Sequence, residues 1–414
     1  MSGTPLLVAS KCDRASQVLF DALQRLTDPD GAPLLTDVIE GEILRGTRGV
    51  FACPFYVWLQ EESLLKLNEA DKRFIERISQ HDTSQTPPSV SDIVFLSRHT
   101  AASGKPSLTV HPIGVPWLTE SGTVELGGKP GRASPPSFRI GALYRSLMAA
   151  TKESPLSEEF EVTLEATHHG PHVDVPACFV EIGSTEEEWG RTDVGDLWAT
   201  VLENHFRAGD NFKGAATTAV VLIGGGHYCP RMGDMAKIGD EVVVGHVLAQ
   251  YTLKDQLEEN ITPDNAVMGG WRQVILEAIA ATKKTFPTQR LICVVDKKWK
   301  STMRAQITGF LDEQGIAWTH KLTKSDILVL EDISALKILS TTYHALLYRK
   351  CRVVNPMGDK WCLIWHQHPR NRGRRHIRNF ATTHDSRADF CRDDNIGLLL
   401  ELRDQEFQFS AAIR

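Results

Sequence analysis

The sequence predicts an α/β fold, because two kinds of segment alternate along it. The first kind is a short run of mostly apolar residues, which is typical of strands that are covered on both faces. The second is a longer stretch whose apolar residues recur at spacings of three and four, as in helices with one buried face. This alternation indicates a layered fold in which helices pack on a sheet.

The predicted strands follow the apolar runs in chain order. They are LLVA (6–9), IVFL (93–96), LTVH (108–111), FEVTLEA (160–166), CFVEI (178–182), AVVLIG (219–224), EVVVGHV (241–247), LICVV (291–295) and ILVL (327–330). The helical spacing predicts helices at residues 15–26, 61–79, 140–150, 185–206, 271–285 and 302–314. Ser184 or Thr185 with Glu187 or Glu188 fits a capping box at the start of the fourth helix. Residues 127–136 are too rich in Gly and Pro for either element and are predicted as a loop.

The composition limits the class of protein. With 414 residues, 42% of them hydrophobic and 24% charged, the chain can form one large α/β domain or two smaller ones. No apolar run approaches the roughly 20 residues of a membrane-spanning helix, and no basic segment precedes residues 6–9, so we expect neither a span nor a secretory signal. The eight cysteines include no C-x-x-C pair, which disfavours a disulfide scaffold and a thiolate zinc site. A reducing compartment is therefore expected, namely the cytoplasm and, as a further option, the nucleus.

The net charge of −6 is unevenly distributed. Residues 349–392 contain eleven Lys or Arg against three Asp, a net charge of +8, which leaves −14 for the rest of the chain. We therefore predict a main domain over residues 1–340 and a basic C-terminal extension of unknown structure over residues 341–414. A polyanion would have to bind a local basic patch, the extension, or both.

The placement of the histidines is the most informative feature. Eight of the fifteen lie between positions 99 and 246, and most of these follow a predicted strand. The carboxyl ends of strands in an open α/β sheet line a common crevice, so histidines that are distant in sequence are expected to share one site. The eight are His99, His111, His168, His169, His172, His205, His227 and His246.

The segment EATHHGP at residues 165–171 is the clearest case, since it follows a predicted strand. Neutral imidazole is a common ligand of Zn²⁺, and a catalytic zinc ion takes three His or carboxylate ligands and a water. In an extended segment His168 and His169 point in different directions, so one would bind metal while the other contacts substrate or donates a hydrogen bond. Taken alone, such a pair is more often part of a surface loop without function.

Two further segments supply candidate groups. In CFVEIGS at residues 178–184, Glu181 lies in an apolar strand, where a carboxylate is costly unless it meets a cation, a metal or a proton to be moved. It is a candidate metal ligand or general base, and the alternative is an exposed or ion-paired carboxylate. In VLIGGGHY at residues 221–228, three glycines could present N–H groups to an oxyanion or phosphate, and His227 follows them. The alternative is a tight turn without a ligand.

A fourth segment, LSRHT at residues 96–100, also follows a strand. Arg98 suits a phosphate or carboxylate and His99 could join the metal ligands, although such a pair is more often only part of the surface. His111 and His246 have less context and are predicted as core residues or as supports of the ligands. The Gly-x-Ser-x-Gly motif is absent, which disfavours a serine hydrolase of that type.

In this order, the four motifs closely resemble those of the archaeal and plant-type D-aminoacyl-tRNA deacylases. They are SRH at residues 97–99, EATHHGP at 165–171, FVEIGS at 179–184 with Trp189, and GGGHY at 224–228. The resemblance spans roughly residues 4–335, and it is the combination that is specific. The loop at 127–136 looks longer than is usual in that family, and the tail from about residue 341 has no counterpart. This tail could be a tRNA-binding arm, a wrongly assigned exon or a disordered segment.

The resemblance implies a zinc-dependent hydrolase that cleaves the ester between a D-amino acid and the terminal adenosine of tRNA. Such an enzyme recycles mischarged tRNA and, in plants, aldehyde-modified D-aminoacyl-tRNA. The implied fold is a mixed-sheet α/β sandwich with helices on both faces, like those of peptidyl-tRNA hydrolases and purine nucleoside phosphorylases. Aminoacyl-tRNA is the expected partner, without membrane or DNA, and a monomer is favoured.

On this hypothesis Zn²⁺ would lower the pKa of a bound water towards about 7 and polarise the ester carbonyl. Its ligands would be a subset of five side chains, namely His99, His168, His169, Glu181 and His227. Of these, His169 is preferred as a catalytic group that contacts substrate. The preferred ligands are His99, His168, His227 and Glu181.

The remaining roles follow from the same hypothesis. If Glu181 is not a ligand, it would accept the proton of the water. The amides of Gly225 and Gly226 would stabilise the oxyanion or hold the terminal phosphate. Arg98 and Lys105 would contact the tRNA backbone.

Two other functions remain compatible with these residues. A zinc-dependent peptidase or amidase would cleave small amides without any need for tRNA. A non-catalytic RNA-binding protein would use the histidines for packing or base stacking, and stoichiometric zinc with measurable turnover would exclude it.

Overall fold

The computed structural model describes residues 3–46, 49–81, 86–119, 122–257, 270–324, 327, 350–354, 360–364, 397–403 and 406–412. The chain divides into two compact units, Met1–Leu328 and Val329–Arg414. The second unit contains a four-stranded sheet in the order β14 (Lys360–Ile364), β13 (Lys350–Val354), β15 (Gly397–Arg403) and β16 (Glu406–Ala412). The first unit contains all of the predicted site residues.

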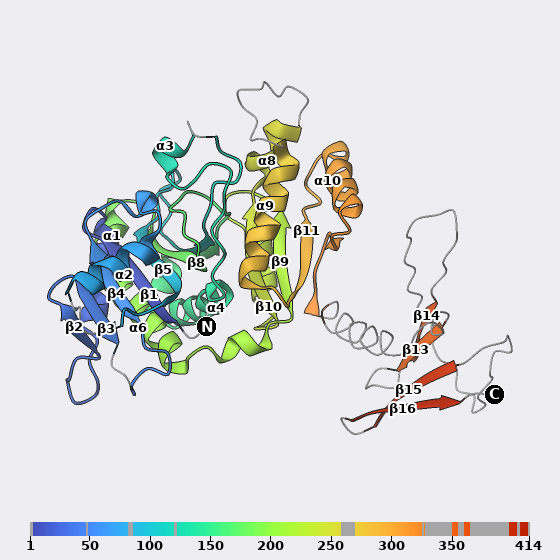
Figure 1. The fold of residues 1–414 in the computed structure, drawn as a ribbon, viewed down its shortest axis with the longest axis horizontal. Helices are drawn as coiled ribbons and strands as arrows, with labels where there is room; N and C mark the ends of the chain where they lie inside the picture. The colour runs from blue at the N-terminus through green and yellow to red at the C-terminus, as the bar shows by residue number, and fades with distance from the viewer. Residues whose placement is uncertain are drawn as a thin grey trace. The chain divides into compact units, whose positions relative to one another are not determined.

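An eight-stranded mixed sheet forms the larger part of the first unit, which confirms the predicted α/β fold (Figure 1). The central strands β4, β1, β5 and β8 are parallel, whereas β6 is antiparallel to β8 and parallel to β7. Strands β2 and β3 form an antiparallel edge next to β4. The order is β2 (Leu35–Ile39), β3 (Ile43–Gly46), β4 (Tyr56–Gln60), β1 (Thr4–Ser10), β5 (Val90–Arg98), β8 (Ala177–Gly183), β6 (Ser107–Pro112) and β7 (Glu161–Leu164).

Helices cover both faces of this sheet, because its central strands are apolar on both sides. Alternate strand residues such as Phe95 and Phe179 pack with Phe74 of helix α2. The intervening residues are also buried, and helices α1 and α4 pack on that side. The helices are α1 (Arg14–Gln24), α2 (Ala70–His81), α4 (Ile140–Lys152) and α6 (Thr192–Ala208), with the short α3 (Thr123–Leu126), α5 (Glu186–Trp189), η1 (Leu64–Lys66) and η2 (Pro155–Glu158).

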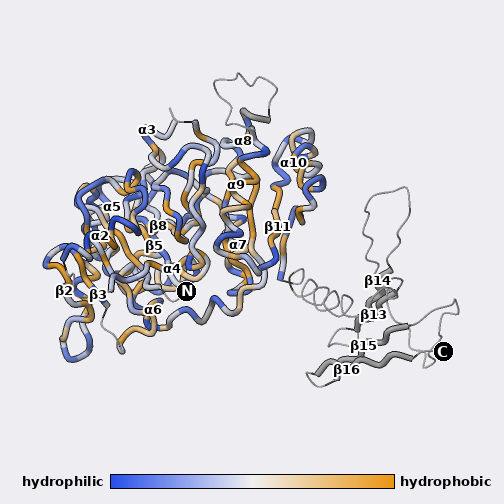
Figure 2. The backbone as a smooth tube through the Cα atoms, in the orientation of Figure 1, coloured by the Kyte–Doolittle hydropathy of each residue, from blue (hydrophilic) through white to orange (hydrophobic). Residues whose placement is uncertain are grey.

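A second sheet of four parallel strands completes the first unit. Its order is β10 (Val242–Leu248), β9 (Thr218–Ile223), β11 (Arg290–Val295) and β12 (Trp318–Thr319). Its core includes Trp271 and Phe310, whose rings meet edge to face at 5.3 Å, and Figure 2 shows hydrophobic residues along β11 and α9. The helices of this part are α7 (Pro230–Ala236), α8 (Gln250–Leu257), α9 (Gly270–Thr285) and α10 (Ser301–Glu313), with η3 (Asn211–Ala215).

The structure differs from the predicted elements in a few places. Strands β2, β3, β4 and β12 and helices α7 and α8 are not predicted; β2, for example, lies at a sheet edge and has exposed polar residues instead of an apolar run. The helix predicted at 61–79 begins only at Ala70. The helix predicted at 185–206 is divided at Gly190, where a Cβ would come within 2.2 Å of the Arg14 side chain.

The strand predicted at 327–330 is wrong at its first residue. The amide of Ile327 donates to the carbonyl of Thr323 at 3.3 Å, which is a helical hydrogen bond. The rest of that prediction lies outside the described residues. In the described part of the chain, every helix is too short or too polar to cross a membrane.

Candidate active site

The candidate active site lies where the two sheets of the first unit meet. The chain that leaves β7 is hydrogen-bonded to both of them. The amide of Glu165 donates to the carbonyl of Val110 in β6 at 3.2 Å, and the amide of Ala166 donates to the carbonyl of His227, after β9, at 2.8 Å. These bonds position Glu165 and the following His168 between the sheets.

Strands β6 and β8 contribute side chains from one face of the larger sheet. In their antiparallel register Thr109 lies opposite Glu181, and His111 lies opposite Phe179. Alternate residues of a strand share a face, so these side chains point the same way. The rings of His111 and Phe179 stack with their centroids 5.2 Å apart, and Thr109 Oγ1 donates to Glu181 Oε2 at 3.1 Å.

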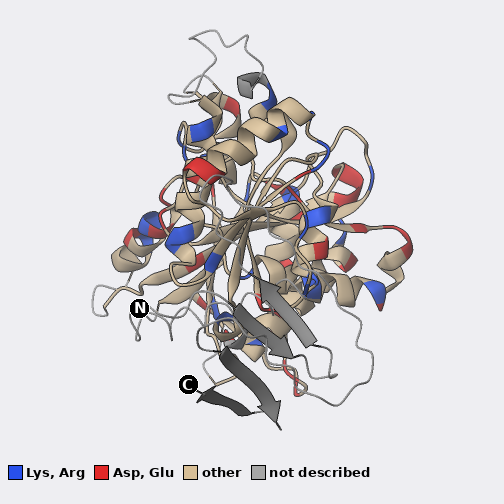
Figure 3. Ribbon diagram, turned by 90° about the vertical axis from the view of Figure 1, so that its right-hand side faces the viewer, with Lys and Arg blue, Asp and Glu red and all other residues tan. Residues whose placement is uncertain are grey.

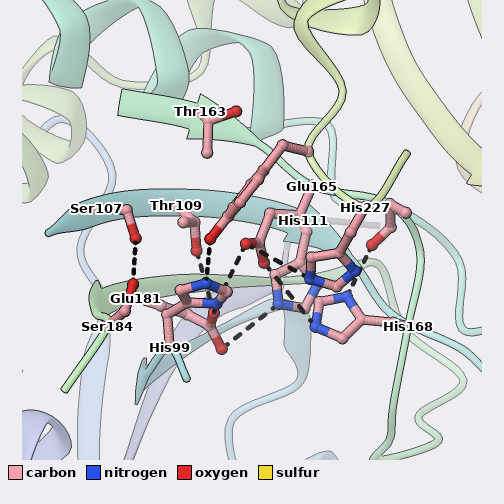
Figure 4. Close-up of polar contacts among 12 residues, drawn as sticks. His99, Ser107, Thr109, His111, Thr163, Glu165, His168, Glu181, Ser184 and His227 are labelled. Atoms are coloured by element: carbon pink, nitrogen blue, oxygen red, sulfur yellow. Dashed lines mark hydrogen bonds and ion pairs between the residues drawn. The ribbon is translucent and has the colours of Figure 1, made fainter. Parts of the chain in front are cut away.

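Two buried carboxylates, Glu165 and Glu181, lie between two groups of histidines (Figure 4). The first group is His99 and His227, and the second is His111, His168 and His169. Glu165 contacts the first group, because its Oε1 is 3.2 Å from His99 Nδ1 and 3.7 Å from His227 Nε2. Its Oε2 is 3.9 Å from the Nε2 of His168, which belongs to the second group. This one carboxylate therefore reaches both groups.

Glu181 also lies between the two groups. Its Oε1 is 3.5 Å from His111 Nε2 and 3.8 Å from His169 Nε2, whereas its Oε2 is 3.4 Å from His99 Nδ1. Within the second group, the ring centroid of His168 is 4.1 Å from that of His111 and 4.3 Å from that of His169. Five histidines and two carboxylates thus form one cluster, which we call the histidine–carboxylate cluster.

Main-chain carbonyls orient two rings of the second group. The Nδ1 of His168 donates to the carbonyl of Ala166 at 2.8 Å, and the Nδ1 of His169 donates to the carbonyl of Gly170 at 2.6 Å. Because a carbonyl oxygen only accepts, each Nδ1 must carry the proton. Each Nε2 then keeps a free lone pair, which a metal ligand requires.

Two tyrosines contact the first group. The Nε2 of His99 is 2.9 Å from the hydroxyl of Tyr228, and the Nδ1 of His227 is 3.3 Å from the hydroxyl of Tyr251. The other nitrogen of each ring faces Glu165. Each ring thus has one nitrogen held by a tyrosine and one directed into the cluster.

The cluster fits a metal ion. Both carboxylate oxygens of Glu165 and the Nε2 of His111 are buried and lack a hydrogen-bond partner among the described residues. A buried carboxylate without such a partner is unfavourable, and a bound cation removes this penalty. Three sets have ligand atoms within 4.8 Å of one another, namely His99, Glu165 and His227; His111, His168 and His169; and His111, Glu165 and Glu181.

The two carboxyl groups differ in pKa because their surroundings differ. Burial raises the pKa of Glu165 well above its usual value, and the charge of Glu181 raises it further. Burial alone would also raise the pKa of Glu181. The electrostatic attraction of His111, and hydrogen bonds from His111 and His169, instead hold the pKa of Glu181 well below its usual range. Without a cation, Glu165 therefore keeps a proton under conditions in which Glu181 is ionised.

Burial keeps several of the histidines neutral. Burial, together with the neighbouring imidazoles of His111 and His99, lowers the pKa of His227 to about 4. Burial likewise lowers the pKa of His111, and it holds the pKa of His168 well below its usual value. Neutral imidazole is the form that binds metal, so these residues need not lose a proton near pH 7.

Two residues of the cluster are not expected from the sequence as ligands. Glu165 appears there only as part of a motif, and His111 is predicted as a core residue or a support. The feature that singles out Glu181 in the sequence also applies to Glu165. Both are acidic residues near the end of an apolar strand. Five residues predicted as ligands or catalytic groups do lie in the cluster, namely His99, His168, His169, Glu181 and His227.

The other predicted site residues lie beside the cluster or on the surface. Gly225 and Gly226 connect β9 to the cluster, and their amide N–H groups have no hydrogen-bond partner in the part of the chain that the structure describes. Arg98 and Lys105 are exposed. Outside the cluster, the Nδ1 of His246 is 3.0 Å from Thr167 Oγ1, which places it behind the segment that carries His168 and His169.

Replacing Gly183 with alanine is expected to displace His99. The added Cβ would lie 2.6 Å from the Cβ of His99 and 2.8 Å from its Cδ2. Overpacking of this kind lowers the free energy of unfolding by about 1–3 kcal/mol, which urea denaturation measures.

Gly309→Ala is the matched control, because its Cβ would meet no atom within 4 Å. Gly309 lies within α10, where alanine is expected to raise the stability by up to about 1 kcal/mol. If Gly183→Ala were as stable as the unmodified protein, the contact with His99 would not be tight.

Comparison with known proteins shows several related chains. A family model described as D-aminoacyl-tRNA deacylase matches residues 86–319, which include the whole cluster. A D-aminoacyl-tRNA deacylase of Arabidopsis thaliana is 38% identical over 322 residues, covering 75% of this chain and 96% of that protein. A D-aminoacyl-tRNA deacylase of Archaeoglobus fulgidus is 30% identical over 250 residues, covering 60% of this chain and 78% of that protein. A crystal structure described as a conserved protein of unknown function has a TM-score of 0.56 and 25% identity, and the match covers 77% of this chain and 95% of that chain.

Proposed function

Because this chain belongs to the D-aminoacyl-tRNA deacylase family, we propose that its histidine–carboxylate cluster is the active site. The enzyme is a hydrolase of the ester bond between a D-amino acid and the terminal adenosine of tRNA, and it recycles mischarged tRNA. The position of Glu165 and Glu181 between five histidines is the observation that supports this site assignment. We also propose a cytoplasmic location, because aminoacyl-tRNA is used there.

We propose that Zn²⁺ is the cofactor and that two ions bind in the cluster. Two of the three-residue sets share no member, and their compositions, two His with one Glu and three His, are both known for catalytic zinc. Glu181 lies next to both sets and would hold them together. This assignment adds Glu165 and His111 to the ligands predicted from the sequence, and it leaves Glu181 out of the ligand sets. The proposed sets are His99, Glu165 and His227, and His111, His168 and His169.

When bound, zinc lowers the pKa of water towards about 7 and polarises the ester carbonyl. The side chains of the cluster have separate tasks. Glu181 belongs to neither proposed ligand set and is ionised, so it would accept the proton of the attacking water. The oxygen of the water would bond to the ester carbon, the bond from that carbon to the ribose oxygen would break, and Glu181 would return the proton to the ribose oxygen, which leaves as a hydroxyl group.

The residues around the reacting groups keep them in position. Until it takes this proton, Glu181 is ionised and orients the rings of His99 and His111, and Thr109 fixes Glu181 through its hydroxyl. The amides of Gly225 and Gly226 are available to the oxyanion, and one such donor contributes about 3 kcal/mol in comparable sites.

Metal analysis combined with deacylation assays tests this function. We expect about two zinc ions per chain, loss of activity after chelation, and recovery when zinc is added back. We also expect D-aminoacyl-tRNA to be cleaved faster than the L form. Full activity after chelation would overturn the proposal that zinc is the cofactor but would leave the substrate assignment intact. Preference for the L ester would overturn the substrate assignment, and cleavage of small amides without tRNA would favour the peptidase alternative.

A further inference from the structure

The four-stranded sheet directs all of its following loops to one edge. Its strands are parallel, so the segments after β10, β9, β11 and β12 leave from the same side. The loop after β9 carries His227 of the active site, and α8, after β10, carries Tyr251, which contacts His227. The loops after β11 and β12 therefore continue this edge away from the active site, in the order of the strands.

The loop after β11 is basic. Its lysines Lys297 and Lys298 are exposed, and neither makes an ion pair with any described residue. Its acidic residue, Asp296, is buried, and its Oδ1 lies 3.3 Å from Nη1 of Arg231. Arg231 thus balances Asp296, and the charge of the two lysines is available to a ligand.

This basic loop packs directly against the glycines that lead to the active site. The Nε1 of Trp299 donates to the carbonyl of Ile223 at 3.1 Å. A Cβ on Gly224 would come within 2.5 Å of Trp299 Nε1, and a Cβ on Gly225 would come within 3.8 Å of Asp296 Oδ2. The lysines leave the sheet one strand away from β9, and neighbouring strands are about 4.8 Å apart.

Strand β12 brings another lysine to the same edge. Val294 pairs with Thr319, so the next residue, His320, lies beside Val295, and its Nδ1 donates to the Val295 carbonyl at 2.8 Å. Lys321 follows, is exposed and makes no ion pair with a described residue. It therefore extends the basic loop by one further strand.

We propose that Lys297, Lys298 and Lys321 bind phosphates of the single-stranded 3′ end of tRNA. Their order along the edge, leading away from His227, suits an RNA strand whose terminal ester lies in the active site and whose preceding phosphates run outwards. The chain outside residues 349–392 has a net charge of −14, so a polyanion that reaches the active site in this part of the chain needs a local basic surface there.

This proposal rests on the proposed function, because it names the surface that presents the substrate to that site. Figure 3 shows Lys and Arg interspersed with Asp and Glu along the described ribbon, which fits recognition by a local group of cations and not by a whole face. It also replaces Arg98 and Lys105, on the side of β5 and β6, as the main contacts to the tRNA backbone.

The test compares the triple variant Lys297→Gln, Lys298→Gln and Lys321→Gln with the unmodified enzyme. The substrates are D-tyrosyl-tRNA and D-tyrosyl-adenosine, which has the ester but no tRNA phosphates. We expect the ratio of kcat/KM for the two substrates to fall by at least about tenfold, mostly through the KM for tRNA. The slope of log kcat/KM against log salt concentration should decrease in magnitude by about 2, since three phosphate contacts are lost at about 0.7 each.

Lys283→Gln with Lys284→Gln is the matched control. These two exposed lysines lie at the end of α9, which leads into the opposite edge of the same sheet. We expect the control to keep the ratio of the unmodified enzyme. An unchanged ratio and salt slope in the triple variant would overturn the proposal, as would the same loss in the control. A loss confined to Arg98→Gln with Lys105→Gln would also overturn it.

A binding measurement separates this proposal from the proposed function. It uses an acceptor-stem RNA that has a single-stranded 3′ end and carries no amino acid, and it follows binding by fluorescence anisotropy. We expect the triple variant to bind it at least about tenfold more weakly than the control does. If the unmodified protein cleaved neither ester, the proposed function would fail, and this measurement would still decide the role of the lysines. Equal binding by the two variants would overturn the lysine proposal alone.

Discussion

His168→Ala is expected to lower kcat/KM for D-aminoacyl-tRNA by about 10³-fold or more. Its Nε2 is 3.9 Å from Glu165, and its ring is 4.1 Å from that of His111 and 4.5 Å from that of His227. A catalytic metal contributes several kcal/mol of transition-state stabilisation, and each 1.36 kcal/mol corresponds to about a tenfold change in rate. The zinc content should fall by about one ion per chain, as measured by mass spectrometry of the acid-digested protein.

His172→Ala is the matched control for this variant. His172 is a buried histidine of the same loop, but its Nε2 lies 3.7 Å from Asp174 and outside the cluster. We expect it to retain both the zinc and the rate. Should the alanine variant fold poorly, His168→Asn keeps a polar side chain while lacking the imidazole, and the same losses are expected. Full zinc content and full rate in a folded His168 variant would show that this residue is not a metal ligand.

Glu165→Gln is expected to have opposite effects on activity and on the stability of the metal-free protein. Loss of the carboxylate should lower kcat/KM by about 10²-fold or more, because Glu165 is one of the proposed metal ligands. The same change should raise the free energy of unfolding of the metal-free protein at pH 7–8. It replaces a buried carboxyl, whose oxygens have no hydrogen-bond partner among the described residues, with a neutral amide.

The pH dependence of that stability difference follows from the direction of the pKa shift. Burial raises the pKa of Glu165 in the folded protein above its value of about 4.3 in the unfolded chain. The folded state then binds more protons than the unfolded state, so this group makes the folded protein less stable as the pH rises through that window. Glu165→Gln removes the effect, and urea denaturation of the chelated proteins should show a gap that widens above about pH 4.3.

Glu161→Gln provides the control, since Glu161 is the exposed first residue of β7, the strand that leads to Glu165. It should change neither the activity nor the pH dependence. A Glu165→Gln enzyme that keeps its zinc and its rate would exclude Glu165 from the chemistry. A metal-free Glu165→Gln protein that is less stable than the unmodified one at pH 8 would contradict the unfavourable burial of the carboxyl group.

The sequence by itself determined the α/β class and most of the central strands, because residues buried on both faces leave an apolar run that no other element explains. It also marked His99, His168, Glu181 and His227, because polar residues that end or interrupt such runs are costly without a partner. Strand β2 escaped prediction because an edge position does not require an apolar run.

Only the tertiary structure decided which of these side chains meet. The order β5, β8, β6 and β7 does not follow the chain, and β6 runs antiparallel to β8, which brings His111 onto the face of Glu181. Alternation along a strand shows which residues share a face, but not which strand lies beside it. For the same reason, the pairing of Glu165 with both histidine groups, and the lysines that follow β11 and β12, become evident only when the two sheets are in place.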